Sequence, residues 1–212
     1  MPSTLPAEKV TLYDLEQRFH LQRCEDPQFF SEWQQNLLPL TETEQLRLDR
    51  VKAIYANLAN HSVLENTVKM AIVSPLLDLA GFYLPPFYIN TEEEIQIQAA
   101  DDGIAIRGRI DVLVIKEQFW LLVIESKRAE FSLRVGIPQA LTYMLGTPNL
   151  ERPLYSMVTN GSNFVFLKLV QQGTPFYARS KEFLLEEDGQ LRQVLQILKQ
   201  LAAIVGSTGY EF

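Results

Sequence analysis

Two acidic residues and a lysine lie close together in the middle of the chain, in a region rich in apolar residues. Asp111 lies within the segment 104–116, and Glu125 and Lys127 end the following segment, 119–127. Carboxylate oxygens suit hard divalent cations such as Mg²⁺ or Mn²⁺. An ammonium group beside such an ion can orient or deprotonate water and stabilise charge that develops on phosphorus. Phosphodiester hydrolysis needs these components.

Two β-strands are expected to position these groups. Apolar residues of the first segment share one parity and Asp111 has the other, so the carboxylate should point away from the apolar row. The second segment stays apolar from Phe119 until Glu125, which is typical of a central strand covered on both faces. The apolar row consists of Ile104, Ile106, Ile110, Val112 and Val114.

A tight turn at the polar residues Lys116–Gln118 should join the two strands. A hairpin loop of roughly two to four residues there places Asp111 opposite a residue close to Glu125. Opposite or diagonal neighbours on one face of a sheet lie roughly 5 to 8 Å apart. One divalent cation can bridge that distance, so we expect a metal site at this hairpin.

The types and order of these residues resemble the PD-(D/E)xK nuclease superfamily. Asp111 and the triplet Glu125-Ser126-Lys127 are similar to its D…ExK signature, with Ile110 in place of the proline before the aspartate. The resemblance implies an α/β fold with a restriction endonuclease-like core, in which helices flank a central mixed β-sheet. It also implies a metal-dependent endonuclease that hydrolyses DNA phosphodiester bonds with Mg²⁺ or Mn²⁺.

Further motifs extend the resemblance over residues 61–170. Glu65 is similar to the helical acidic residue that precedes the core, and Gln139 with Tyr143 is similar to the QxxxY helix motif. The Thr-Asn-Gly sequence at 159–161 also fits. The segment is most similar to the N-terminal nuclease domain of type I restriction enzyme R subunits and to nuclease domains of the RecB kind.

The resemblance assigns a role to each of these residues. Asp111 and Glu125 would hold the metal, with Glu65 as a further ligand. Lys127 would act on the attacking water or on the transition state. The two residues of the QxxxY motif lie on one face of a helix, because they are four positions apart, and would support substrate placement.

Each motif also has an ordinary structural explanation. Ser62 and Glu65 form a capping-box pattern, in which Glu65 would only satisfy a backbone donor at a helix start. Gln139 and Tyr143 would otherwise lie on a helix surface, with the tyrosine reaching solvent. The carboxylates of the hairpin could instead form an ion-pair network. The alternative function is a non-catalytic nucleic-acid-binding or assembly protein that retains the nuclease fold.

The cations near the hairpin predict where DNA would bind. The segment between Gly103 and Ala140 contains six cationic and four acidic residues, although the whole chain has a net charge of -7. Affinity for nucleic acid depends largely on neutralising phosphates, so we expect a locally basic site in an acidic protein. The alternative is a solvated charged face. The candidate DNA-contacting residues are Arg107, Arg109, Arg128 and Arg134.

The composition restricts the class of protein and of metal site. A chain of 212 residues with 47% hydrophobic residues is sufficient for one domain with a sizeable core. We find no apolar run of membrane-spanning length and no signal-like start, so a cytoplasmic protein without a membrane span is expected. Cys24, His20 and His61 are too few for a Cys/His zinc cluster, so oxygen atoms must hold any metal.

The patterning divides the chain into three parts. They are an N-terminal helical extension (1–60), the nuclease-like core (61–170), and a C-terminal strand with a capping helix packed on the core (171–212). The extension is expected to contain a loose tail (1–10) and helices over about 11–22, 26–34 and 41–60. Phe29, Phe30 and Trp33 favour core packing over a base-stacking surface.

The remaining elements follow from breakers and periodicity. They are a helix starting near 62, kinked at Pro75 and ended by Gly81, strands over 95–99, 154–159 and 164–169, and helices over 133–145 and 190–205. The chain lacks a GxxxxGK[ST] phosphate loop, so any motor would be separately encoded. DNA is the expected partner, and a homodimer and separately encoded motor or specificity subunits remain open.

Overall fold

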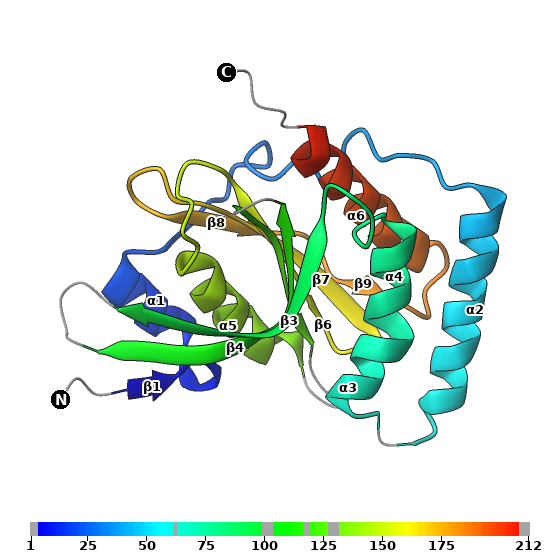
Figure 1. Cartoon of the computed structure of the whole chain (residues 1–212), viewed down its shortest axis with the longest axis horizontal. Coiled ribbons are helices and arrows are strands. Elements are labelled where there is room, and N and C mark those ends of the chain that lie inside the picture. Colours follow the sequence, from blue (N-terminus) through cyan, green and yellow to red (C-terminus); the bar gives the residue numbers. More distant parts are fainter. Residues whose placement is uncertain (1–3, 62, 99–103, 117–118, 127–131, 208–212) are drawn as a thin grey trace.

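The structure, a computed structural model, describes residues 4–61, 63–98, 104–116, 119–126 and 132–207. These residues form a mixed α/β fold, in which helices flank a central mixed sheet of nine strands (Figure 1). The expected fold class is therefore confirmed.

Strands and helices both occur throughout the described part of the chain. The strands are β1 (Thr4–Pro6), β2 (Gln22–Arg23), β3 (Tyr88–Gln98), β4 (Ala105–Lys116), β5 (Phe119–Ser126), β6 (Leu154–Thr159), β7 (Asn163–Val170), β8 (Phe176–Arg179) and β9 (Phe183–Leu184). The helices are η1 (Ala7–Lys9), α1 (Leu12–Phe19), α2 (Glu42–Leu58), α3 (Glu65–Val68), η2 (Lys69–Val73), α4 (Ser74–Leu79), α5 (Leu133–Leu145) and α6 (Gln190–Ser207).

The sheet has β5 in its interior. Its strand order is β1-β4-β5-β6-β7-β8-β2, with β3 paired to β4 and β9 paired to β7. β5 runs antiparallel to β4 and parallel to β6. This position confirms the central strand that the apolar run before Glu125 predicts.

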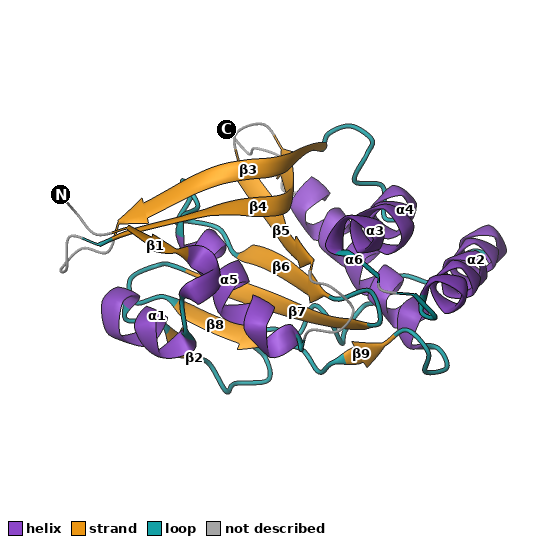
Figure 2. Ribbon diagram, turned by 90° about the horizontal axis from the view of Figure 1, so that it is seen from below, coloured by secondary structure: helices purple, strands orange, loops and turns teal. Residues whose placement is uncertain are grey.

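Two hydrophobic cores cover the two faces of the sheet. α1 and α5 lie over one face, and the α3-η2-α4 helix and α6 lie over the other, with α2 packed outside them (Figure 2). Leu141 and Met144 of α5 are fully buried in the first core, and Leu76 and Leu195 are fully buried in the second. None of the helices in the described ranges is long and apolar enough to cross a lipid bilayer.

The prediction of a loose tail over residues 1–10 is wrong for the described residues from Thr4 onward. β1 pairs in parallel with β4, and Ala7 and Val10 are buried in the core beneath α5. Their partners lie about a hundred residues away in the sequence, so a local window contains no sign of this packing. The segment 1–60 thus contributes β1 and β2 to the sheet as well as α1 and α2.

The predicted helix over 26–34 is also wrong, because this segment consists of turns. A carboxylate oxygen of Asp26 accepts the backbone N–H of Gln28, which favours a turn over a helix start. The aromatic residues of the segment still pack as the sequence favours. Phe30 is buried beside Tyr155, and Trp33 packs edge-on against Phe183.

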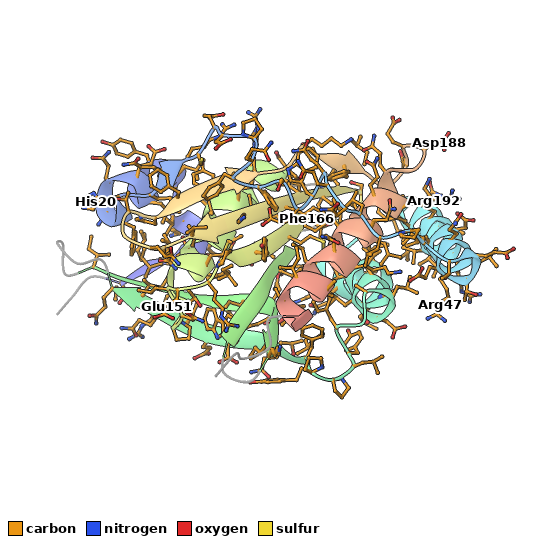
Figure 3. All side chains as sticks on the ribbon, turned by 90° about the horizontal axis from the view of Figure 1, so that it is seen from above. His20, Arg47, Glu151, Phe166, Asp188 and Arg192 are labelled. Atoms are coloured by element: carbon orange, nitrogen blue, oxygen red, sulfur yellow. The ribbon has the colours of Figure 1, made fainter. Side chains whose placement is uncertain are left out.

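α2 confirms the helix predicted over 41–60. Its capping box is complete, because Thr41 Oγ1 accepts the backbone N–H of Glu44 at 3.2 Å while Glu44 Oε2 accepts that of Thr41 at 2.7 Å. Lys199 of α6 donates to the same glutamate at 2.6 Å. Figure 3 shows Arg192 where α6 approaches α2. These contacts fix α2 against the second core.

The helix that follows is interrupted where proline predicts. α3, η2 and α4 run from Glu65 to Leu79, and the π-helical section η2 ends just before Pro75. Proline lacks an N–H and its ring crowds the carbonyl four residues earlier, so the wider π turn accommodates it. Gly81, with a φ of 87°, lies just past the helix end, as expected.

Candidate active site

The pairing of β4 with β5 brings the two carboxylates of the hairpin together. Val112 pairs with Ile124, and continuing this antiparallel register by one residue sets Asp111 opposite Glu125. Both residues are buried, with exposed fractions of 5% and 1%. Because opposite residues of an antiparallel pair share one face of the sheet, the carboxylates are neighbours.

The single apolar row predicted for this strand is wrong. Ile106 and Ile110 pack in the core beneath α5, whereas Val112 and Val114 pack in the core beneath α6. The apolar residues of this row that precede Asp111 are therefore buried on one face of the sheet, and those that follow it are buried on the other face. A strict period of two assumes a regular strand, but β4 leaves the sheet edge shared with β1 and enters the interior beside β5.

The partner strand is distorted at the same place. Thr91 pairs with Val112 and Glu93 with Ile110, so Glu92 lies across from Asp111. Glu92 has a φ of 58°, a left-handed conformation that residues other than glycine rarely adopt. Such strain clusters at functional sites.

The two carboxylates open into a cavity of about 910 Å³. The residues predicted for the site that line this cavity are Glu65, Asp111, Glu125, Gln139, Tyr143, Arg107 and Arg109. The other residues of the wall are Pro6, Ala7, Glu8, Glu92, Glu94, Ile95, Gln96 and Gly108. Lys127 and Arg128 lie outside the described residues. Arg134 is exposed on the first turn of α5 and does not line the cavity.

Glu65 is the first residue of α3. The N-cap residue is Leu64, and no side chain caps this helix start. The capping box would place Glu65 at the third helical position, and Ser62, the other residue of that alternative, lies outside the described residues. The carboxylate of Glu65 contributes to the cavity wall.

Gln139 and Tyr143 are buried, so the alternative of a solvated helix surface is wrong. The Tyr143 hydroxyl accepts Nε2–H of Gln139 at 2.7 Å and the backbone N–H of Arg109 at 3.3 Å. Burial raises the pKa of this hydroxyl, and the negative charges of Glu125 and Asp111 raise it further. Tyr143 therefore remains a neutral phenol that links α5 to β4.

Lys69 is a site residue that the sequence interpretation missed. Its ammonium donates to Glu92 Oε1 at 2.7 Å and to Asp111 Oδ1 at 3.2 Å. Burial lowers the pKa of Lys69, but hydrogen bonds to Glu92 and Asp111 outweigh this and raise it above the ordinary value. Its position four residues after Glu65 on the expected helix could have indicated it.

The described wall of the cavity is acidic, and Lys127 and Arg128, which the prediction of a basic site includes, lie outside the described residues. Six acids line it, against the arginines Arg107 and Arg109. Arg107 donates to Gln96, and Arg109 lies 3.6 Å from Glu92 and 3.5 Å from Glu94. Four of these acids come from segments outside residues 103–140, so the charge balance within that range does not include them. The acids of the wall are Glu8, Glu65, Glu92, Glu94, Asp111 and Glu125.

The donor atoms fit a hard divalent cation. Asp111 and Glu125 offer buried carboxylate oxygens, and the ammonium of Lys69 against Asp111 shows that a cation is accommodated there. Mg²⁺ commonly takes one or two carboxylates and completes its shell with water and substrate phosphates. Within the described ranges, no group of three His, Cys, Asp or Glu residues is arranged to hold a metal. Glu65 as a third direct ligand is therefore not seen.

Comparison with known proteins finds similarity among solved structures but none in sequence. No protein-family model and no curated protein match the chain. Among solved structures it is similar, at 21% identity and a TM-score of 0.40, to a fragment assigned to an HsdR subunit of a type I restriction enzyme from Vibrio vulnificus YJ016. The match covers 68% of this chain and 26% of that chain, so this chain spans about a quarter of its length. Function is therefore inferred from the cavity itself.

Proposed function

We propose that the protein is a Mg²⁺- or Mn²⁺-dependent deoxyribonuclease that hydrolyses phosphodiester bonds at this cavity. The observation that carries the proposal is that two buried carboxylates, Asp111 and Glu125, lie next to the paired residues Val112 and Ile124 and line one cavity. Two adjacent buried carboxylates repel unless a cation lies between or beside them. DNA is the proposed substrate, because the sequence motifs resemble those of DNA-cleaving enzymes.

The proposed roles follow from position. Asp111 and Glu125 hold the ion, which when bound polarises a phosphoryl oxygen and lowers the pKa of a water molecule. Lys127, two residues after Glu125, is proposed to orient or deprotonate the attacking water. Gln139 and Tyr143 fix the backbone of β4 beside Asp111 through the hydroxyl of Tyr143.

The acidity of the cavity wall makes the cation important for substrate binding as well. Phosphate groups and six carboxylates would repel each other, since the arginines of the wall already contact Glu94, Glu92 and Gln96. A divalent ion would reduce this repulsion where the scissile phosphate binds. We therefore propose that DNA binds much more tightly with divalent cations than without them.

One observation favours a non-catalytic alternative. Lys69 already neutralises part of the charge on Asp111 and Glu92, as a purely structural ion-pair network would. A protein of this kind would bind nucleic acid or assemble with other subunits without cleaving. Metal-dependent cleavage distinguishes the two functions.

The test is cleavage of one supercoiled plasmid with Mg²⁺ or Mn²⁺. We expect wild-type protein to cleave and both Asp111→Ala and Glu125→Ala to lose cleavage, because each change removes a proposed metal ligand. Glu151→Ala is the matched control, because Glu151 is exposed and does not line the cavity. Circular dichroism checks that each variant folds. If both cavity variants cleave at the wild-type rate, the site is wrongly assigned.

A further inference from the structure

Lys69 lies at the boundary between two cavities. Asp111 and Glu92 line both the cavity described above and a neighbouring one of about 480 Å³, and Lys69 lines the second. The lysine side chain is 16% exposed, so a ligand in the second cavity can reach it. Any group that approaches Asp111 from this side meets the ammonium.

The hydrogen bonds of Lys69 leave room for a ligand. A lysine ammonium has three N–H donors. Among the described residues, Glu92 and Asp111 accept two of them. The third N–H can therefore donate a hydrogen bond to a ligand that binds in the second cavity.

The backbone on both sides of this ion pair departs from regular structure. Lys69 begins the π-helical section η2, and its partner Glu92 has a left-handed backbone. Sections of π-helix and strained residues occur frequently at functional sites. Glu92 also contacts Arg109. The ammonium of Lys69, which belongs to η2, is held by one acid from β3 and one from β4.

We propose that Lys69 is a second catalytic lysine, which donates its third N–H to an oxygen of the scissile phosphate group while Asp111 takes part in metal binding. This inference rests on the proposed nuclease function. An ammonium fixed in position before the reaction stabilises negative charge that develops on phosphate oxygens. Glu92 is a positioning residue, because it holds the ammonium beside Asp111.

The test combines single-turnover cleavage at saturating Mn²⁺ with the Mn²⁺ affinity, measured from the dependence of the melting temperature on Mn²⁺. For Lys69→Met we expect cleavage about a hundredfold slower, the loss typical of removing one such donor. Mn²⁺ should bind at least as tightly as to wild type, because the ammonium no longer competes for Asp111. Lys69→Arg keeps the charge and should cleave faster than Lys69→Met.

Lys168→Met is the matched control for losing a buried ion pair. Lys168 is 12% exposed and lies 2.5 Å from Glu32, away from both cavities. We expect this variant to lose stability but to cleave at the wild-type rate. If Lys69→Met is unfolded, Glu92→Gln replaces it as the test, because it weakens the contact that holds the ammonium. We expect about tenfold slower cleavage from Glu92→Gln.

Several results would overturn the inference. Lys69→Met that cleaves at the wild-type rate with Mn²⁺ saturating would show that Lys69 is only a counter-ion of Asp111. Loss of both cleavage and Mn²⁺ binding would show that it only maintains the metal site. If Lys69→Met does not fold, cleavage by Glu92→Gln at the wild-type rate would likewise show that Lys69 is only a counter-ion of Asp111. Absence of cleavage by wild type would refute the proposed function itself.

Discussion

At the scale of single residues, the hydroxyl of Tyr143 connects the helix α5 to the strand that bears Asp111. It accepts hydrogen bonds from Gln139 and from the backbone of Arg109 in a buried setting. Burial raises the pKa of this hydroxyl, and nearby Glu125 and Asp111 raise it further, so it does not ionise near neutral pH. We therefore expect this hydroxyl to position β4 by hydrogen bonding and not to act as a general base.

Tyr143→Phe tests this role. The change removes an acceptor used by the buried amide of Gln139 and by the part-buried backbone N–H of Arg109, so we expect the free energy of unfolding to fall by about 1–3 kcal/mol. Urea denaturation measures the loss. Tyr83→Phe is the matched control, because the hydroxyl of Tyr83 donates to Ser74 at an exposed position and its loss should be nearly neutral. Equal stability of the two variants would mean that the Tyr143 hydroxyl contributes nothing.

The sequence predicts the residues of the site better than their contacts. Asp111 and Glu125 are recognised as acidic residues in two apolar segments joined by a short turn, although the single apolar row expected for the first strand is wrong. Lys69 and Glu92 could not be assigned from local patterns, since their contact spans 23 positions and needs a left-handed residue in a strand. The roles assigned to Asp111, Glu125, Lys127, Glu65, Gln139 and Tyr143 remain predictions.

At the scale of elements, Gly108 allows η1 and α5 to approach β4. A Cβ atom at this position would lie 2.7 Å from Ala7 Cβ and 2.7 Å from Tyr143 Cε1. Real Cβ atoms essentially never come so close, so a larger residue would displace the first helical turn or the tyrosine. This close packing also explains why residues 4–10 are ordered against α5 and not a loose tail.

Gly108→Ala should therefore destabilise the protein by about 1–3 kcal/mol, as overpacking of a core does. Thermal and urea denaturation measure the change. Gly206→Ala is the control, because its Cβ would meet only the far end of the Phe87 ring, at 3.3 Å, and alanine favours a helix. A Gly108→Ala protein as stable as wild type would contradict the close packing.

Element boundaries follow the sequence where local signals are strong. The capping box of α2 and the glycine after α5 mark real helix ends. The segment 26–34 is mispredicted, because the Asp26-Pro27 pair suits both a helix start and a turn. Burial of Phe30 against Tyr155, 125 positions later, is a tertiary contact that the segment itself does not encode.

At the scale of the whole molecule, the candidate site is acidic because several distant segments meet there. Its carboxylates come from η1, α3, β3, β4 and β5, and only those of β4 and β5 belong to the predicted hairpin. Apolar periodicity predicts most of the individual strands and helices, and the mixed sheet flanked by helices is what the resemblance to the nuclease superfamily implies. The sequence does not predict which of these elements converge on the cavity, since this depends on the strand order.

The central claim is that Asp111 and Glu125 form a divalent-cation site, and the direct measurement is the melting temperature as Mn²⁺ is added. An ion bound only by the folded state adds about 2.7 kcal/mol of stability at a hundredfold excess over its Kd. For a domain of this size this corresponds to a rise of roughly 5–11 °C. We expect this rise in wild type and none in the double variant Asp111→Asn, Glu125→Gln. The claim would be contradicted if millimolar Mn²⁺ left the melting temperature of the wild type unchanged, or if it raised the melting temperatures of the wild type and the double variant equally.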